Sequence, residues 1–177
     1  MTQIETTSPL ERLEALYADC GAEIYRWVLG MLDRPEDAED AVQSLWVKLA
    51  RDSHRLDEVR DLSAYLWRSA RNHVYSELRR RALERLWTPP LSEDHSEWLT
   101  AADESGVTAD DLRDVAGAVR HLRPKLRAVV LLVGFAGCTV DEAARRLEIP
   151  RGTAASRYHA ALRKLKKNLG VEETDHA

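Results

Sequence analysis

The sequence predicts an all-α protein of two small helical domains, which are joined by an acidic and flexible linker. Apolar residues recur at spacings of three and four along nearly every segment, which is the period of a helix. No strand-like alternation of useful length interrupts that pattern. Between residues 87 and 111 the helical period fails, and the stretch contains Pro89 and Pro90, seven acidic residues and no Lys or Arg. Such a composition is typical of a linker at a domain boundary.

Three helices are expected in the first domain, residues 8–86, which predicts a three-helix bundle. The first helix follows an apolar stripe over 10–31 that includes Cys20, whose thiol we expect to be buried and inert. The second begins at Pro35, because proline suits the first helical position and the two acids after it suit the positive end of the helix dipole. The third follows a polar loop and begins after Asp61, which can serve as its N-cap.

The second domain, residues 112–170, is expected to contain four helices. Its first helix ends before Pro124, which starts a strongly apolar helix that two glycines then end. Thr139, with Glu142 three residues later, forms a capping box that begins a short helix. A turn and a longer last helix complete the domain, so its second half has the form of a helix-turn-helix unit.

Charge is distributed unevenly along the chain, although the net charge is only −4. From residue 112 to the end there are 13 Lys and Arg against 7 Asp and Glu, whereas the linker over 87–111 has seven acids alone. The first 86 residues are close to balanced, with 13 basic and 16 acidic side chains. The pattern indicates a mixed module, an acidic connector and a basic module that could bind nucleic acid.

The helix-turn-helix unit is the strongest local sign of DNA binding. Its second helix would enter the major groove, where side chains outside the apolar stripe can donate to bases and phosphates. The candidate contacts are Arg151, Thr153, Ser156, Arg157, His159 and Lys164. Arg163, Lys166 and Lys167 could also neutralise phosphate charge. The alternative is an ordinary helical hairpin with a solvated basic face.

Two segments of the second domain resemble the extracytoplasmic-function (ECF) sigma factors of RNA polymerase. Residues 122–132 (LRPKLRAVVLL) resemble the segment that opens the second domain of that family. Residues 149–159 (IPRGTAASRYH) resemble its recognition-helix signature, roughly I-P/S-E-G-T-V-K-S-R-L-H. The resemblance implies that the last helix contacts the promoter near the −35 element. The sequence departs from the pattern at Arg151, Ala154, Ala155 and Ala160, where two basic contacts are lost and one is gained.

The first domain resembles the same family. Residues 37–43 (DAEDAVQ) match its D-A-E-D-x-V-Q helix, which implies docking on the coiled coil of the polymerase clamp. The residues that would dock are Asp37, Asp40, Gln43 and Trp46. The acids and the amide would accept hydrogen bonds from basic residues of the partner, and the indole would be an apolar anchor. A favourable first helical turn would explain the acids equally well.

A second motif of the first domain points to the −10 element. Residues 65–72 (YLWRSARN) resemble the family's W-L-Y-R-I-A-R-N, and three arginines follow at 79–81. The resemblance implies that this helix opens and reads the −10 element through Trp67, Arg68, Arg71, Asn72 and Tyr75. Aromatic faces, cations and an amide can stack on unpaired bases and hydrogen-bond to them. The alternative is that the aromatic rings belong only to the core.

Together these resemblances predict a sigma factor that binds core RNA polymerase and directs transcription initiation at specific promoters. The expected partners are core polymerase, through its clamp and its flap, promoter DNA, and an anti-sigma factor or another regulatory protein. Two alternatives remain: a helix-turn-helix transcription regulator, and a sigma-like interaction protein without promoter recognition. The acidic linker could enter the RNA channel of polymerase, mask the basic second domain, or act as a spacer.

Several classes of function are not expected from this sequence. It contains no nucleophile–base pair, no glycine-rich phosphate loop and no cluster of metal ligands, so we expect no enzymatic activity, cofactor or metal. The longest apolar run, 128–136, is too short to cross a bilayer. The N-terminus lacks the apolar segment of a secretory signal. We therefore expect a cytoplasmic protein without membrane insertion.

Overall fold

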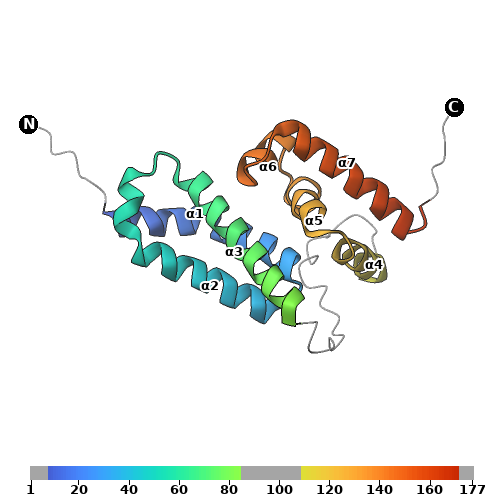
Figure 1. Cartoon of the computed structure of the whole chain (residues 1–177), viewed down its shortest axis with the longest axis horizontal. Helices are drawn as coiled ribbons and strands as arrows, with labels where there is room; N and C mark the ends of the chain where they lie inside the picture. Colours follow the sequence, from blue (N-terminus) through green and yellow to red (C-terminus); the bar gives the residue numbers. More distant parts are fainter. Residues whose placement is uncertain (1–7, 85–108, 172–177) are drawn as a thin grey trace, which may run out of the picture.

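The structure is a computed structural model that describes residues 8–84 and 109–171, and these residues form helices, turns and loops (Figure 1). In chain order the elements are α1 Pro9–Leu32, α2 Pro35–Arg51, the 3₁₀ helix η1 Ser53–Glu58, α3 Leu62–Glu84, α4 Ala109–Arg120, α5 Pro124–Val130, the π-helical η3 Leu131–Phe135, α6 Val140–Arg146 and α7 Arg151–Asn168. The all-helical prediction is confirmed for these residues. Most of the expected linker lies outside them, so its flexibility stays a prediction.

Local capping chemistry sets where several helices begin. The Asp61 carboxylate accepts a hydrogen bond from the backbone N–H three residues later, at 2.9 Å, and thereby caps α3. The capping box predicted at the start of α6 is present, because Thr139 and Glu142 exchange side-chain and backbone hydrogen bonds. A second capping box, between Ser8 and Glu11, begins α1. The apolar pattern did not reveal it, although the residue types and the spacing were in the sequence.

The helix after Pro124 differs in detail from the prediction. The chain is α-helical only as far as Val130 and then widens into the π-helical turn η3, in which the backbone N–H of Ala136 donates to the Leu131 carbonyl at 3.0 Å. Leu131 and Leu132, at the start of this turn, are both buried. The segment ends at Gly137, whose φ of 70° suits glycine.

The two helical units are packed against each other. Figure 1 shows α1, α2 and α3 as one group and α4 to α7 as a second group beside it. Their buried side chains form a single continuous hydrophobic cluster. The indole N–H of Trp27 in α1 donates to the Ala128 carbonyl in α5 at 3.2 Å. Gly30 lets Leu131 approach α1, since a Cβ at this glycine would lie 2.8 Å from the leucine side chain.

This contact between the units was not expected from the sequence, which predicted two modules connected only by a linker. Apolar spacing identifies the buried face of each helix, but it does not say which neighbouring helix covers that face. Within the residues that the structure describes, no helix is long and apolar enough to span a membrane.

Candidate nucleic-acid interface

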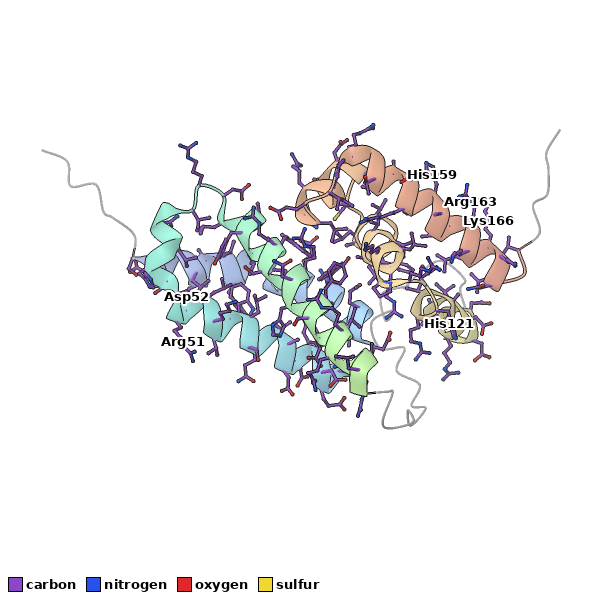
Figure 2. All side chains as sticks on the ribbon, viewed as in Figure 1. Arg51, Asp52, His121, His159, Arg163 and Lys166 are labelled. Carbon is purple, nitrogen blue, oxygen red and sulfur yellow. The ribbon has the colours of Figure 1, made fainter. Side chains whose placement is uncertain are left out.

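The long helix α7 has an outer face of polar and basic side chains. Ser156, His159, Arg163 and Lys166 are exposed and follow one another at helical spacing. Figure 2 shows the last three of these on the side of α7 away from α5. The opposite side of the helix, which includes Ala161 and Leu165, is buried. We call these four exposed residues the outer stripe, and their arrangement suits contact with a nucleic-acid backbone.

Two of the predicted DNA contacts lie on a different side of α7. Arg157 and Lys164 line a groove of about 760 Å³ between α7, α3 and the start of α5. The other lining residues are Tyr75, Leu78, Arg79, Ala82, Arg123, Pro124, Lys125 and Leu126. Five of the ten lining side chains are cationic and none is acidic, and apolar side chains form the rest of the walls. The six residues predicted to read DNA are therefore divided between this basic groove, the outer stripe and the start of the helix.

The start of α7 is held in place by short-range contacts. Arg151 is exposed and its guanidinium pairs with the Asp141 carboxylate of α6 at 2.9 Å. Thr153 is half-buried, and its carbonyl accepts a hydrogen bond from the Ser156 hydroxyl at 3.0 Å. Ala154 is fully buried against the rest of the domain. The departure from the family signature at this position therefore changes core packing and removes no side chain that could reach a base.

Trp67 lies in the core, contrary to the expectation that its ring faces DNA. It is 1% exposed and packs edge-to-face on Trp27 of α1, with ring centroids 5.7 Å apart. The Arg146 guanidinium of α6 covers the same indole at 4.7 Å from its centroid. In this arrangement a base cannot stack on Trp67, because the side chain is buried.

The polar residues predicted to read the −10 element lie together on α3 and are contacted by the second unit. Arg68 forms an ion pair with Glu148, which follows α6. Arg71 donates to the Leu147 carbonyl, pairs with Glu148 at 3.1 Å, and donates to the exposed Asn72 side chain at 3.0 Å. Half-buried Tyr75 lies at the edge of the basic groove, where burial raises the pKa of its hydroxyl.

The face of α2 predicted to bind polymerase is exposed along most of its length. Asp40 and Gln43 are exposed, and Val47, which is 52% exposed, continues the same face at helical spacing. Trp46 is half-buried and packs edge-to-face on Tyr17 of α1, with ring centroids 5.0 Å apart. Val47 was not among the predicted contacts, although its spacing from the other two residues could have identified it.

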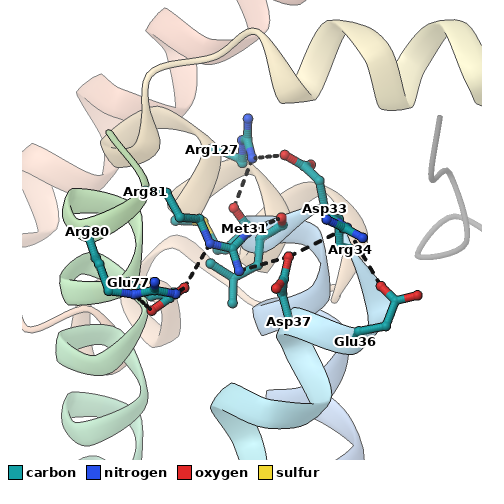
Figure 3. Close-up of polar contacts among 10 residues, drawn as sticks. Met31, Asp33, Arg34, Glu36, Asp37, Glu77, Arg80, Arg81 and Arg127 are labelled. Carbon is teal, nitrogen blue, oxygen red and sulfur yellow. Dashed lines mark hydrogen bonds and ion pairs between the residues drawn. The ribbon is translucent and has the colours of Figure 1, made fainter. Parts of the chain in front are cut away.

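Asp37, also predicted to contact polymerase, is engaged within the bundle. Its carboxylate pairs with Arg81 of α3 at 2.9 Å, and Arg81 in turn pairs with Glu77 at 2.9 Å (Figure 3). Hydrogen bonds from Arg80 and Arg81 lower the pKa of Glu77 to about 2. This network joins α3 to the start of α2, so Asp37 has a structural role in this arrangement.

The two thiols are free and buried. Burial raises the pKa of Cys20 to about 11, and burial also raises the pKa of Cys138, so neither thiol is activated as a nucleophile. In the parts of the chain that the structure describes, no three His, Cys, Asp or Glu side chains are grouped so that they could hold a metal ion.

Comparison with known families assigns both units. Residues 16–84 match the family described as Sigma-70 region 2, and residues 112–165 match Sigma-70, region 4. The chain is 30% identical over 149 residues to the RNA polymerase sigma-E factor of Streptomyces antibioticus, covering 82% of this chain and 78% of the relative. It is 29% identical over 158 residues to the ECF RNA polymerase sigma factor SigL of Mycobacterium tuberculosis, covering 89% of this chain and 88% of the relative.

Two solved structures have a similar fold. One is the sigma factor RpoE from Bartonella quintana in complex with the anti-sigma factor NepR, with a TM-score of 0.68, 23% identity, and coverage of 92% of this chain and 99% of that one. The other is CnrH in complex with the cytosolic domain of CnrY, with a TM-score of 0.62, 23% identity, and coverage of 90% and 88%. The family matches and the sequence relatives show that this chain belongs to the ECF sigma factors, which are not enzymes but direct RNA polymerase to promoters.

Proposed function

We propose that this sigma factor binds core RNA polymerase through the exposed face of α2 formed by Asp40, Gln43 and Val47, with Trp46 at its edge. The observation that carries the proposal is that two polar acceptors and an exposed apolar side chain follow one another on one helical face. Energetic hot spots favour large aromatic anchors, and half-buried Trp46 is the aromatic side chain at the edge of this face. The partner surface would be the basic coiled coil of the polymerase clamp, while the second unit would contact the flap.

Promoter recognition would use the two other surfaces. Arg68, Arg71, Asn72 and Tyr75 on α3 would open and read the −10 element, because they combine cations, an amide and an aromatic ring. The outer stripe of α7, with Arg151 and Thr153 at its start, would bind duplex at the −35 element. Arg157 and Lys164 would join this contact from the groove side. We place the protein's action in the cytoplasm, where polymerase and promoter are found.

A protein regulator is proposed on the same grounds. Both solved structures of similar fold are complexes with another protein, and in one of them the pair is named as a sigma factor and an anti-sigma factor. In this chain the basic groove, with its apolar walls, would suit an acidic and partly apolar segment of such a partner.

The proposed docking face is tested by the affinity of the full chain for core polymerase. The double variant Gln43→Ala/Val47→Ala removes two exposed side chains of α2 without touching the core. We expect a loss of about 2 kcal/mol, or roughly 30-fold, because few contacts dominate such interfaces. The matched control is Glu14→Ala/Asp19→Ala, which removes two exposed side chains of α1. Equal affinities for the test and control variants would show that polymerase docks elsewhere.

A further inference from the structure

We infer that the turn of the helix-turn-helix unit covers the −10-binding face of α3 in the free protein, with Glu148 taking the place of promoter phosphates. This inference rests on the proposed role of α3 in promoter opening. It assigns to Glu148, Leu147 and Arg146 a contact with α3 that competes with promoter DNA. These residues must move away from α3 before the −10 element can bind.

The position of Glu148 follows from the backbone of the turn. It is the second residue after α6 and has a φ of 48°, in the left-handed region, which a non-glycine residue rarely adopts. Its backbone N–H still donates to the Arg145 carbonyl at 3.1 Å, so the turn is closed. The carboxylate contacts α3 and pairs with Arg68 and with Arg71.

These two guanidiniums are the cations that α3 would offer to a DNA strand. An arginine presents a planar set of donors that suits a carboxylate and a phosphate equally. Arg71 is further engaged, because it also donates to the Leu147 carbonyl. A phosphate that bound both side chains together would have to displace the carboxylate from Arg68 and both the carboxylate and the carbonyl from Arg71.

Arg146 extends the same contact to the aromatic part of the α3 face. Its guanidinium lies over Trp67 and is held there by an ion pair with Glu23 of α1 and a contact of 2.7 Å with the Cys138 sulfur. Three consecutive residues, Arg146 to Glu148, therefore cover one aromatic and two basic residues of α3. Separation of the two units would uncover one face of the Trp67 ring.

The ion pairs between the turn and α3 are the part of this contact that polymerase could release most easily. The Arg68 and Glu148 side chains are 49% and 36% exposed, and exposed ion pairs are individually weak, whereas Arg71 is 17% exposed and buried contacts between α1 and α5 also hold the units together. The proposed polymerase face of α2 lies outside this contact. We call the arrangement in which the two units are in contact the closed form. Polymerase could therefore bind the closed form first and then favour separation of the units.

The test compares Glu148→Gln with Asp141→Asn in the full chain. Both changes remove one carboxylate of the second unit, but Asp141 pairs within that unit, with Arg151. The readouts are affinity for a single-stranded DNA of mixed sequence and the radius of gyration from small-angle X-ray scattering. We expect Glu148→Gln to raise DNA affinity about fivefold and to increase the radius, since two weak ion pairs are lost. Asp141→Asn should change neither. If Glu148→Gln changes neither readout, or enlarges the radius without raising DNA affinity, the inference is wrong.

A third variant separates this inference from the proposed function on which it rests. Arg68→Ala breaks the same ion pair from the other side, and it also removes a proposed DNA contact. It should enlarge the radius as Glu148→Gln does, yet lower affinity for single-stranded DNA. A rise in DNA affinity for Glu148→Gln and a fall for Arg68→Ala would support both the competing contact of Glu148 and the proposed DNA-binding role of Arg68. If Arg68→Ala enlarges the radius and DNA affinity rises, the proposed −10 role of this arginine is wrong, although the contact between the units stands.

Discussion

Helices α2 and α3 belong to the same three-helix bundle, but their proposed binding faces differ in whether the second unit contacts them. On α2, Asp40, Gln43 and Val47 are exposed to solvent. On α3, Arg68 and Arg71 are paired with Glu148 of the second unit. The closed arrangement would thus leave the polymerase face available while it covers the DNA face.

This difference suggests an order of events for initiation. A sigma factor whose DNA face is covered when free has little chance of occupying DNA without polymerase. Binding to polymerase through α2 breaks no contact between the units. DNA binding then follows when the units separate. The closed form must then be stable enough to persist in the free chain and weak enough to open in the complex.

The largest expected effect concerns Arg127, which anchors α5 to the end of α1. Its side chain is 9% exposed and donates to the Met31 carbonyl and the Asp33 carboxylate, both at 3.0 Å (Figure 3). It also donates to the Arg120 carbonyl. Replacing it in Arg127→Ala would leave buried acceptors without their donor, so we expect a loss of about 3 kcal/mol in the free energy of unfolding.

Urea denaturation of the full chain, followed by circular dichroism, measures this loss. Lys125→Ala is the matched control, because this side chain lies on the same helix and is exposed; its expected effect is within about 0.5 kcal/mol. A loss below about 1 kcal/mol for Arg127→Ala would mean that the units are held mainly by apolar packing. The contact that covers the α3 face and leaves the α2 face exposed would then not depend on the hydrogen bonds of Arg127.

Sequence reasoning was most successful where the signal is local. The capping box of Thr139 and Glu142 and the N-cap at Asp61 involve residues three positions apart, so the structure could confirm them directly. Whether Trp67 faces DNA or belongs to the core was left open by the sequence, because its neighbours, Trp27 and Arg146, are far from it in the chain. The ion pairs of Glu148 were missed for the same reason, since a lone glutamate in a turn gives no sign of a partner some 80 residues earlier.

A smaller effect is expected at Glu77, which joins α3 to α2 through Arg81 and lies outside the contact between the units. Its pKa is about 2 in the folded protein, below the ordinary value of 4.5, so the charged form stabilises the fold. That contribution is fully present above about pH 4.5 and is lost as the pH falls towards about 2. Glu77→Gln should therefore lower the free energy of unfolding by about 1–2 kcal/mol at neutral pH.

Urea denaturation at a series of pH values checks this prediction. The difference between the original chain and Glu77→Gln should shrink as the solution is acidified through this range, because the carboxyl of the original chain becomes neutral. The radius of gyration at neutral pH should stay unchanged, since Glu77 does not contact the second unit. A difference that is independent of pH would show that the charge of Glu77 is not what stabilises this junction.

The smallest expected effect extends the comparison of exposed and covered faces to α7, using two arginines of the same helix. Arg163 belongs to the outer stripe, whereas Arg157 lies in the basic groove next to Tyr75. In the free chain Arg163→Ala should weaken binding to duplex DNA and reduce the slope of log affinity against log salt by about 1, as expected for a phosphate contact. Arg157→Ala should have little effect on this binding in the free chain, because the groove wall formed by α3 limits access to the side chain.

In the complex with polymerase, where we propose that the units separate, Arg157→Ala should cost about 1–3 kcal/mol on promoter sequence relative to random duplex if it contacts a base. Titrations of both variants against salt, without and with polymerase, provide the measurement. Equal losses for the two arginines in the free chain would show that the groove side of α7 is already available, and that only α3 is covered in the closed form.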